Sequence, residues 1–227
     1  MSRYTSILFD ADGTLFDFDK AETFAFRAAL KEMSLPCSED IVSDYKRINA
    51  SLWELLEKGC ITQKQIRIRR FEMLHERFRF AGNPQNTADS FIKFLSRGVY
   101  FLDGAVDILE YLHGKYKLYL VTNGITQVQE SRYALSGIDK YFEAMFISEE
   151  LKVSKPDVRY FDIVFSEIGL ADKGEALIVG DSLTSDIKGG NNAGIDTCWY
   201  NPCGKANGKD ARCTYEIAHL DNLTEIL

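Results

Sequence analysis

The stretch LFDADGTLFD, residues 8–17, places two aspartates one residue apart at the end of an apolar run. The run is typical of a buried strand, and glycine and threonine follow the second aspartate directly, at Gly13 and Thr14. Two carboxylates this close repel each other, so Asp10 and Asp12 need a cation, a shared proton or ordered water between them. The stretch therefore predicts a strand whose end carries a charged site.

Short apolar runs recur along the chain, and each ends in polar residues or glycine. They are SILFD (6–10), KLYLVT (117–122), AMFIS (144–148), ALIVGD (176–181) and DTCWY (196–200). Stretches with helical spacing lie between the later runs, near residues 104–114, 125–136, 156–168 and 184–193. Runs without polar alternation suit strands that are covered on both faces, and strands alternating with helices are typical of a parallel sheet. We predict an α/β fold, a doubly wound parallel sheet.

The segment between the first two runs breaks this rhythm, because it spans about a hundred residues. Apolar residues at helical spacing recur through residues 26–33 and 41–55, and a fourth helix fits residues 87–96. Thr62 with Gln65 three residues later is a capping-box pattern that predicts the start of a third helix. We therefore expect an inserted all-helical domain over residues 17–98, with the core formed by residues 1–16 and 99–227.

Composition narrows the classes of protein that the chain can represent. The 227 residues are 45% hydrophobic and carry a net charge of −7, which disfavours partnership with a nucleic-acid polymer or an anionic membrane. The N-terminal stretch lacks the apolar core of a secretory signal, and the five cysteines show no Cys-x-x-Cys pair. These features predict a cytoplasmic protein with free thiols. The three histidines match no metal-ligand spacing, so we expect oxygen ligands for any metal cofactor.

Polar residues follow the ends of separate predicted strands. Asp10 and Asp12 end the first, Thr122 and Asn123 the second, and Asp181 the fourth, while SKPD (154–157) follows the third. In an open α/β sheet, ligands bind outside the carboxyl ends of the strands. We expect these carboxylates, the hydroxyl and the Lys155 ammonium to meet at one edge of the sheet.

This set resembles the haloacid dehalogenase (HAD) superfamily of aspartate-nucleophile hydrolases, and the resemblance covers essentially the whole chain. Its four motifs look like DADGT (10–14), Thr122 in LVTNG, Lys155 in SKPD and GDSLTSD (180–186). The resemblance implies that the helical insertion is a cap that governs substrate specificity.

The resemblance also implies a role for each motif residue. Asp10 would attack phosphorus and become an aspartyl phosphate, while Asp12 would act as general acid and then as general base. An aspartate at position 12 favours phosphoryl transfer over dehalogenation. Lys155 would neutralise the nucleophile and a phosphoryl oxygen. The implied phosphate-binding residues are Thr122, Asn123, Gly124 and Lys155.

The implied cofactor is Mg²⁺, which prefers oxygen ligands and would offset the repulsion between the paired carboxylates. Its protein ligands would be Asp10, the backbone carbonyl of Asp12, and Asp181. Asp186 is implied as a supporting residue that orients the site through water or through Lys155.

Longer stretches look like the noncanonical pyrimidine 5′-nucleotidase subgroup, which removes the 5′-phosphate of nucleoside monophosphates. They are FDADGTLFDFDKAE (9–22) and GDSLTSDIKGGNNAGIDTCWYNP (180–202). Members of that subgroup often carry an acidic residue where Gly13 stands here. The substrate class implied is a small phosphate monoester, with a nucleoside monophosphate favoured.

Other functions remain open at this point. A sugar phosphate or phosphoglycolate phosphatase would share the chemistry and differ in the cap, and a phosphomutase would retain the phosphoryl group. A phospho-receiver module also groups aspartates, a threonine and a lysine around Mg²⁺. The Asp-x-Asp pair and the long helical insertion argue against the receiver.

Two further stretches have a plain structural interpretation. The arginine-rich segment RIRRFEMLHERFR (67–79) is predicted to form a solvated helix face. Gly189, Gly190 and Gly194 indicate close packing of a helix on a strand.

Overall fold

The computed structural model describes residues 3–207 and 211–227. The chain forms two compact units, which we call the sheet unit and the helical unit. The sheet unit comprises Met1–Asp17, Phe101–Gly124 and Ser136–Leu227, and the helical unit comprises Phe18–Tyr100 and Ile125–Leu135.

A parallel sheet forms the centre of the sheet unit. Its strands within the described residues are β1 (Ser6–Phe9), β2 (Lys117–Thr122), β3 (Ala144–Ile147), β4 (Ala176–Gly180), β5 (Asp196–Tyr200) and β6 (Tyr215–Ile217). Their order is β3-β2-β1-β4-β5-β6, so the chain winds outward in both directions from β1. Every neighbouring pair is parallel, and Phe9 at the end of β1 is level with Leu120 and Val179. The predicted doubly wound α/β fold is confirmed, and β6 is an additional edge strand.

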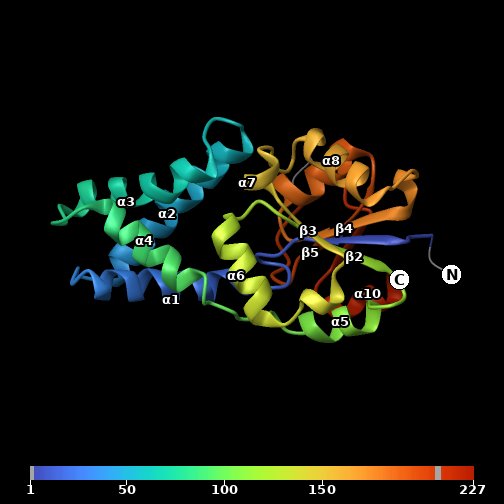
Figure 1. Ribbon diagram of the computed structural model, residues 1–227, viewed down its shortest axis with the longest axis horizontal. Coiled ribbons are helices and arrows are strands. Elements are labelled where there is room, and N and C mark those ends of the chain that lie inside the picture. Colours follow the sequence, from blue (N-terminus) through green and yellow to red (C-terminus); the bar gives the residue numbers. More distant parts are fainter. Residues whose placement is uncertain (1–2, 208–210) are drawn as a thin grey trace. The chain divides into compact units, whose positions relative to one another are not determined.

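Helices cover both faces of this sheet. The sheet unit contains α5 (Ala105–Leu112), α7 (Ser148–Leu151), α8 (Val158–Ile168), α9 (Lys188–Ala193) and α10 (Leu223–Ile226). Figure 1 shows α8 on one side of the sheet and α5 and α10 on the other. Tyr160, Phe161 and Val164 of α8 belong to the same buried cluster as Leu8 and Ile178 of the sheet. Strands buried on both faces explain the absence of polar alternation in their sequences.

Two glycines allow α9 to lie close to its neighbours, as the sequence indicated. A Cβ at Gly190 would come within 2.5 Å of Thr197 and 2.7 Å of Ile178, and one at Gly189 within 2.7 Å of Phe161. Gly194 ends the helix with a positive φ of 76°. A residue larger than glycine at position 189 or 190 would push α9 away from these side chains.

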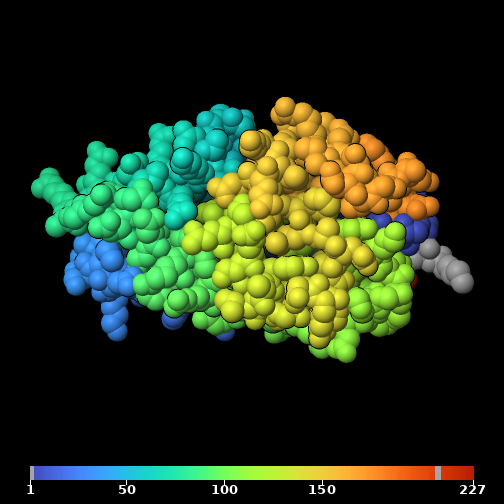
Figure 2. All heavy atoms as spheres, viewed as in Figure 1, coloured from blue at the N-terminus to red at the C-terminus, as the bar shows by residue number. Residues whose placement is uncertain are grey.

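The helical unit contains α1 (Phe18–Glu32), α2 (Glu39–Glu57), α3 (Gln63–Phe78), α4 (Pro84–Leu95) and most of α6 (Thr126–Ser136). Thr62 and Gln65 form the predicted capping box at the start of α3. Helix α3 packs against α4. Figure 2 shows the two segments (teal to green) side by side. The sequence predicts a core over residues 99–227, which includes residues 125–135. In the structure, Ile125 and Val128 pack into the apolar cluster of the helical unit.

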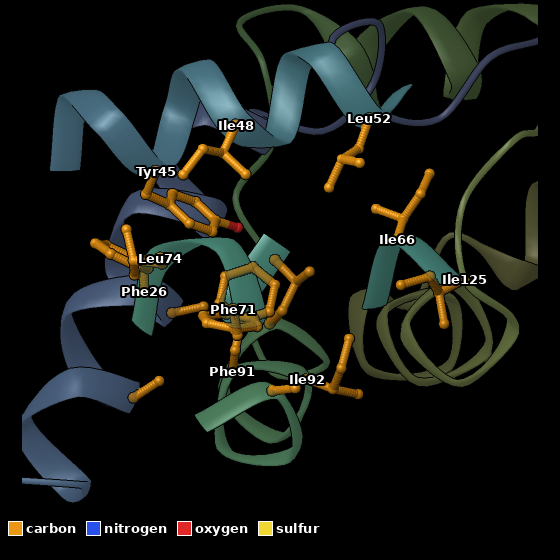
Figure 3. Packing of buried hydrophobic residues seen from close by; sticks show 14 of the residues in the cluster. Phe26, Tyr45, Ile48, Leu52, Ile66, Phe71, Leu74, Phe91, Ile92 and Ile125 are labelled. Carbon is orange, nitrogen blue, oxygen red and sulfur yellow. The ribbon is translucent and has the colours of Figure 1, made fainter. Parts of the chain in front are cut away.

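Aromatic rings dominate the interior of the helical unit. Figure 3 shows Tyr45 of α2 among Phe26, Phe71 and Phe91, with Ile66 near Ile125. The Tyr45 ring stacks on Phe26 with centroids 4.0 Å apart. The prediction that residues 67–79 form a solvated arginine face is wrong for Arg70, which is only 1% exposed. Its guanidinium lies over the Phe91 ring at 4.4 Å, so a cation–π contact replaces part of its hydration.

No helix among the described residues is long and apolar enough to cross a membrane.

Candidate functional site

The first predicted site residue, Asp10, lies directly after β1 at the carboxyl edge of the sheet. Its backbone N–H donates to Val179 O on β4 at 2.9 Å, which continues the sheet ladder for one more residue. The chain then turns back, because Leu15 and Phe16 both donate to the carbonyl of Ala11. Asp10 is buried, so its carboxylate needs partners that replace water.

Lys155 is the main partner of Asp10. It is fully buried, and its ammonium donates to Asp10 Oδ1, Asp186 Oδ1 and the carbonyl oxygen of Val121, each at 2.7 Å. Burial alone would lower the pKa of this ammonium, but the carboxylates of Asp10 and Asp186 outweigh it and raise the pKa. The three N–H donors of Lys155 therefore all have acceptors, and the side chain stays charged.

Asp186 belongs to a π-helical turn, Leu183–Ile187, that follows β4. Its Oδ2 accepts the backbone N–H of Ser182 at 3.1 Å. Gly180 makes room for it, since a Cβ there would lie 2.3 Å from Asp186 Oδ2. Asp186 thus contacts Lys155 directly, and its supporting role in the site stays a prediction.

Asp181, the last residue of the fourth predicted run, completes the group of carboxylates. Burial and, to a smaller extent, the neighbouring charge of Asp186 together raise its pKa to about 7. The indole Nε1 of Trp199 donates to its backbone carbonyl at 2.9 Å. Gly13 lies against its side chain: the φ of Gly13 is +87°, and a Cβ there would be 2.7 Å from Asp181 Cγ.

The carboxylates fit a small divalent cation. One oxygen each of Asp10, Asp181 and Asp186 lies within 4.8 Å of the others. Burial raises the pKa of Asp10 well above its usual range, Lys155 opposes this, and Asp186 and Asp181 add to it. Three carboxylates with a single ammonium leave an excess of negative charge in a buried place, and a bound cation would remove that excess. An oxygen-only donor set suits Mg²⁺.

Three of the four predicted phosphate-binding residues lie at the end of β2: Thr122 is its last residue, and Asn123 and Gly124 follow it. Thr122 is buried, and its hydroxyl oxygen accepts the backbone N–H of Gly124 at 3.0 Å. The side chain of Asn123 donates from Nδ2 to Lys155 O at 2.8 Å and accepts the N–H of Lys155 on Oδ1 at 2.9 Å. Thr122, Asn123 and Lys155 therefore come together, as expected. The carboxamide of Asn123 and the backbone N–H of Gly124, however, bond to protein atoms.

Asp12 and Thr14 lie in the turn after Asp10. Asp12 is half-buried and pairs as an isolated bridge with Phe16, which stacks on Phe101 with ring centroids 5.2 Å apart. Thr14 is fully buried, and its hydroxyl has no hydrogen-bond partner among the described residues. The turn is thus braced by its backbone and by aromatic packing.

Sequence reasoning missed the contacts that position these side chains. The carbonyl of Val121, the side-chain amide of Asn123 and the indole of Trp199 each bond to a site residue that is distant in sequence. Trp199 lies in a stretch that the resemblance singled out, but no local pattern indicates which atom it contacts.

Known proteins resemble this chain over its whole length. YfnB of Bacillus subtilis (strain 168), a HAD-hydrolase, is 38% identical over 100% of this chain and 97% of its own. Its crystal structure, bound to magnesium and described as revealing interdomain movement, matches with a TM-score of 0.92 at 38% identity, covering 99% of this chain and 98% of that one.

Two of the relatives that carry a named activity are pyrimidine 5′-nucleotidases. The pyrimidine 5′-nucleotidase PynA of Streptococcus pneumoniae is 39% identical over 99% of this chain and 95% of its own. The pyrimidine 5′-nucleotidase YjjG of Escherichia coli (strain K12) is 34% identical, covering 97% of this chain and 96% of its own. Residues 7–200 match the family described as haloacid dehalogenase-like hydrolase. Because that match spans both units and all of the site residues described above, the chain is a member of the haloacid dehalogenase-like hydrolase family.

Proposed function

We propose that this enzyme hydrolyses phosphate monoesters through an aspartyl phosphate on Asp10, and that its substrates are pyrimidine nucleoside 5′-monophosphates. The observation that carries the proposal is the contact of Lys155 with Asp10 and Asp186 at 2.7 Å each, in a buried site that also contains Asp181. A carboxylate in this setting is oriented, partly neutralised and shielded from water.

In the first step, an Asp10 oxygen would attack phosphorus while the bond from phosphorus to the leaving oxygen breaks. Asp12, the half-buried carboxyl two residues on, would protonate the departing alkoxide. The products are the aspartyl phosphate and the free alcohol. Lys155 would keep Asp10 in place and limit the repulsion between it and the incoming phosphate dianion.

In the second step, a water molecule would attack the same phosphorus atom after giving a proton to Asp12. The bond from phosphorus to Asp10 breaks, inorganic phosphate leaves, and both carboxyl groups return to their starting states. Phosphate-monoester hydrolysis requires accelerations of up to ~10²¹, about 29 kcal/mol, so several groups have to act together.

Mg²⁺ fits the donor set and would be held by Asp10, Asp181 and the backbone carbonyl of Asp12. When bound, it supplies positive charge that stabilises the phosphoryl oxygens in the transition state. This chain's own residues would orient the nucleophile and move the proton.

The nucleotide substrate is supported by the relatives. PynA and YjjG are named pyrimidine 5′-nucleotidases, and their resemblance to this chain extends through both units. The helical unit, the predicted cap, would govern which alcohol is accepted as leaving group. We also propose a cytoplasmic location, which agrees with free thiols at all five cysteines.

The test is the release of inorganic phosphate from a panel of nucleoside monophosphates, hexose phosphates and phosphoglycolate, with Mg²⁺ and with EDTA. Metal-dependent release chiefly from dUMP, dTMP or UMP is the expected result. Release chiefly from a sugar phosphate would retain the chemistry and reject the nucleotide substrate. The absence of release from every ester would contradict the proposed reaction and favour a mutase.

A further inference from the structure

The side chain of Asn123 pairs with both polar groups of one distant peptide segment. Its Nδ2 donates to Lys155 O at 2.8 Å, and its Oδ1 accepts the N–H of Lys155 at 2.9 Å. A carboxamide carries a donor and an acceptor side by side, so it reproduces the pairing that a neighbouring strand would offer. An ionised aspartate, which has the same shape, offers acceptors only.

The backbone of Lys155 needs such a partner because it lies outside helices and strands. It follows α7, which ends at Leu151, and precedes α8, which begins at Val158. Without a ladder or a helix, the N–H and C=O of a loop residue depend on side chains or water. Asn123 supplies both bonds from a position 32 residues away.

The same strand end also contacts the far end of the Lys155 side chain. Val121 O accepts from the ammonium at 2.7 Å, and Asn123 lies two residues further along the chain. Lys155 is therefore held at two points by the end of β2, through its main chain and through Nζ. These two points fix the flexible four-carbon stem between them.

The position of Nζ is demanding. It reaches Asp10 Oδ1, Asp186 Oδ1 and Val121 O together at 2.7 Å. A displacement of the Lys155 main chain would lengthen at least one of these bonds, because the acceptors belong to three separate segments of the sheet unit.

We propose that Asn123 is a positioning residue for Lys155: its carboxamide sets the Lys155 backbone so that the ammonium bridges Asp10 and Asp186. This role differs from the phosphate contact expected from the sequence. It rests on the proposed function only in so far as Asp10 carries the phosphoryl group.

A matched control is the side-chain bond from Asn192 of α9 to Pro156, the residue that follows Lys155 in the same loop. Asn192 donates from Nδ2 to the carbonyl of Pro156 at 2.9 Å, and it is exposed. Asn192→Ala removes a side-chain bond to the same loop without touching the backbone of Lys155. Asn123→Ala removes the two bonds to Lys155 itself.

The first measurement is steady-state phosphate release by Asn123→Ala, Asn123→Asp and Asn192→Ala. Asn123→Ala should lower kcat about 10- to 100-fold, the scale expected for a misplacement of about 1 Å. Asn123→Asp should be at least as slow, because a carboxylate keeps the acceptor but faces Lys155 O with a second acceptor. Asn192→Ala should stay within about twofold of the wild type. Equal losses for Asn123→Ala and Asn192→Ala would overturn the proposal.

A double-mutant cycle separates positioning from direct substrate contact. In a Lys155→Ala background there is nothing left to position, so adding Asn123→Ala should cost less than about twofold. If Asn123 contacts the substrate on its own, its full penalty will persist in that background, and the proposal fails. An activated aryl phosphate keeps the residual rates measurable.

A crystal structure of Asn123→Ala gives a readout that does not depend on activity. We expect the separation of Nζ from Asp10 or Asp186 to exceed hydrogen-bond distance, while the sheet is unchanged. An unmoved ammonium would contradict the proposal even if activity were lost. A wild-type protein without phosphatase activity would instead count against the proposed function, and the structural test would still decide the role of Asn123.

Discussion

Two of the buried polar clusters among the described residues balance charge differently. The core charge cluster, in the sheet unit, consists of Asp10, Lys155, Asp181 and Asp186, and the three donors of its ammonium all have acceptors at 2.7 Å. The cap polar cluster, in the helical unit, consists of Glu22, Tyr45, Asn49 and Arg70. All four of its residues are at most 5% exposed.

In the cap polar cluster, neutral groups separate the two charges. Glu22 Oε1 accepts from Asn49 Nδ2 at 2.6 Å and from the Tyr45 hydroxyl at 3.2 Å. Arg70 donates from Nη1 to Asn49 Oδ1 at 3.1 Å, while its Nε and Nη2 have no hydrogen-bond partner among the described residues. Burial raises the pKa of Glu22 to about 7, although the charge of Arg70 opposes the shift.

The difference indicates which cluster would gain from a bound cation. Three carboxylates against one ammonium leave the core charge cluster with surplus negative charge, which a metal ion can neutralise. One carboxylate against one guanidinium leaves the cap polar cluster balanced in charge. Its guanidinium is nevertheless incompletely hydrogen-bonded among the described residues. Changes in the core charge cluster should therefore alter chemistry and metal binding. A change of Glu22 in the cap polar cluster should alter how stability depends on pH.

Replacing the nucleophile should give the largest effect. Asp10→Asn keeps the shape of the side chain but removes the attacking oxygen, so turnover should fall by at least about 10⁴-fold. The folded structure should persist, as monitored by circular dichroism and thermal melting. Near-normal phosphate release by this variant would reject Asp10 as the nucleophile.

Removing the single cation of the core charge cluster should cost stability. Lys155→Met leaves the buried carboxylates without their ammonium, and breaking a buried pair in this way costs about 3–5 kcal/mol. The loss should be smaller at pH 5.5 than at pH 7.5, because protonation removes the unpaired charges. Urea unfolding at the two pH values measures it. An equal loss at both would show that packing, and not charge, dominates.

The Glu22 carboxyl group of the cap polar cluster should make the free energy of unfolding depend on pH. The pKa of Glu22 is about 7 when folded against a usual value of 4.5, so folding favours its protonated form. Its contribution is full below pH 4.5 and is lost as the pH rises through 7, a change of about 3 kcal/mol. Glu22→Gln keeps an acceptor for Tyr45 and Asn49 and should remove this slope.

Measuring wild type and Glu22→Gln in EDTA from pH 4.5 to 8 checks that expectation. Asp181 has a pKa of about 7 and gives a slope of the same sign, so the variant should flatten the curve only in part. Adding Asp181→Asn should flatten the curve further if the two clusters act separately, and the slope that remains has the sign expected from Asp10, whose pKa burial also raises. An unchanged slope in Glu22→Gln would mean that this carboxyl group does not titrate differently on folding.

The sequence predicted the features that depend on local pattern. Apolar runs located β1 to β5, the capping box located the start of α3, and the strand-end rule brought Asp10, Thr122, Lys155 and Asp181 to one unit. The burial of Arg70 escaped prediction because its helix is rich in charge, and a local pattern cannot tell which arginine faces aromatic rings. The contacts of Asn123 and Trp199 escaped prediction because their partners lie 32 and 18 residues away.

Gly13 provides the finest test of the core charge cluster, because it sets the space available to Asp181. A methyl group at this position would lie 2.7 Å from Asp181 Cγ, and the φ of +87° adds backbone strain. Gly82, in the helical unit, has a φ of +91° with nothing within 4 Å of an added Cβ, so Gly82→Ala is a matched control for strain alone.

Both alanine variants should lose about 1–2 kcal/mol from the left-handed backbone. Only Gly13→Ala should also displace Asp181, which we expect to raise the Mg²⁺ concentration for half-maximal thermal stabilisation about tenfold, within the range seen when supports of a metal ligand are altered. Melting curves across a Mg²⁺ titration separate the two contributions, since the strain shifts every curve equally and the displacement changes only the response to metal. If both variants respond alike to Mg²⁺, the space beside Asp181 does not govern the metal site, and the charge surplus of the core is relieved without help from this turn.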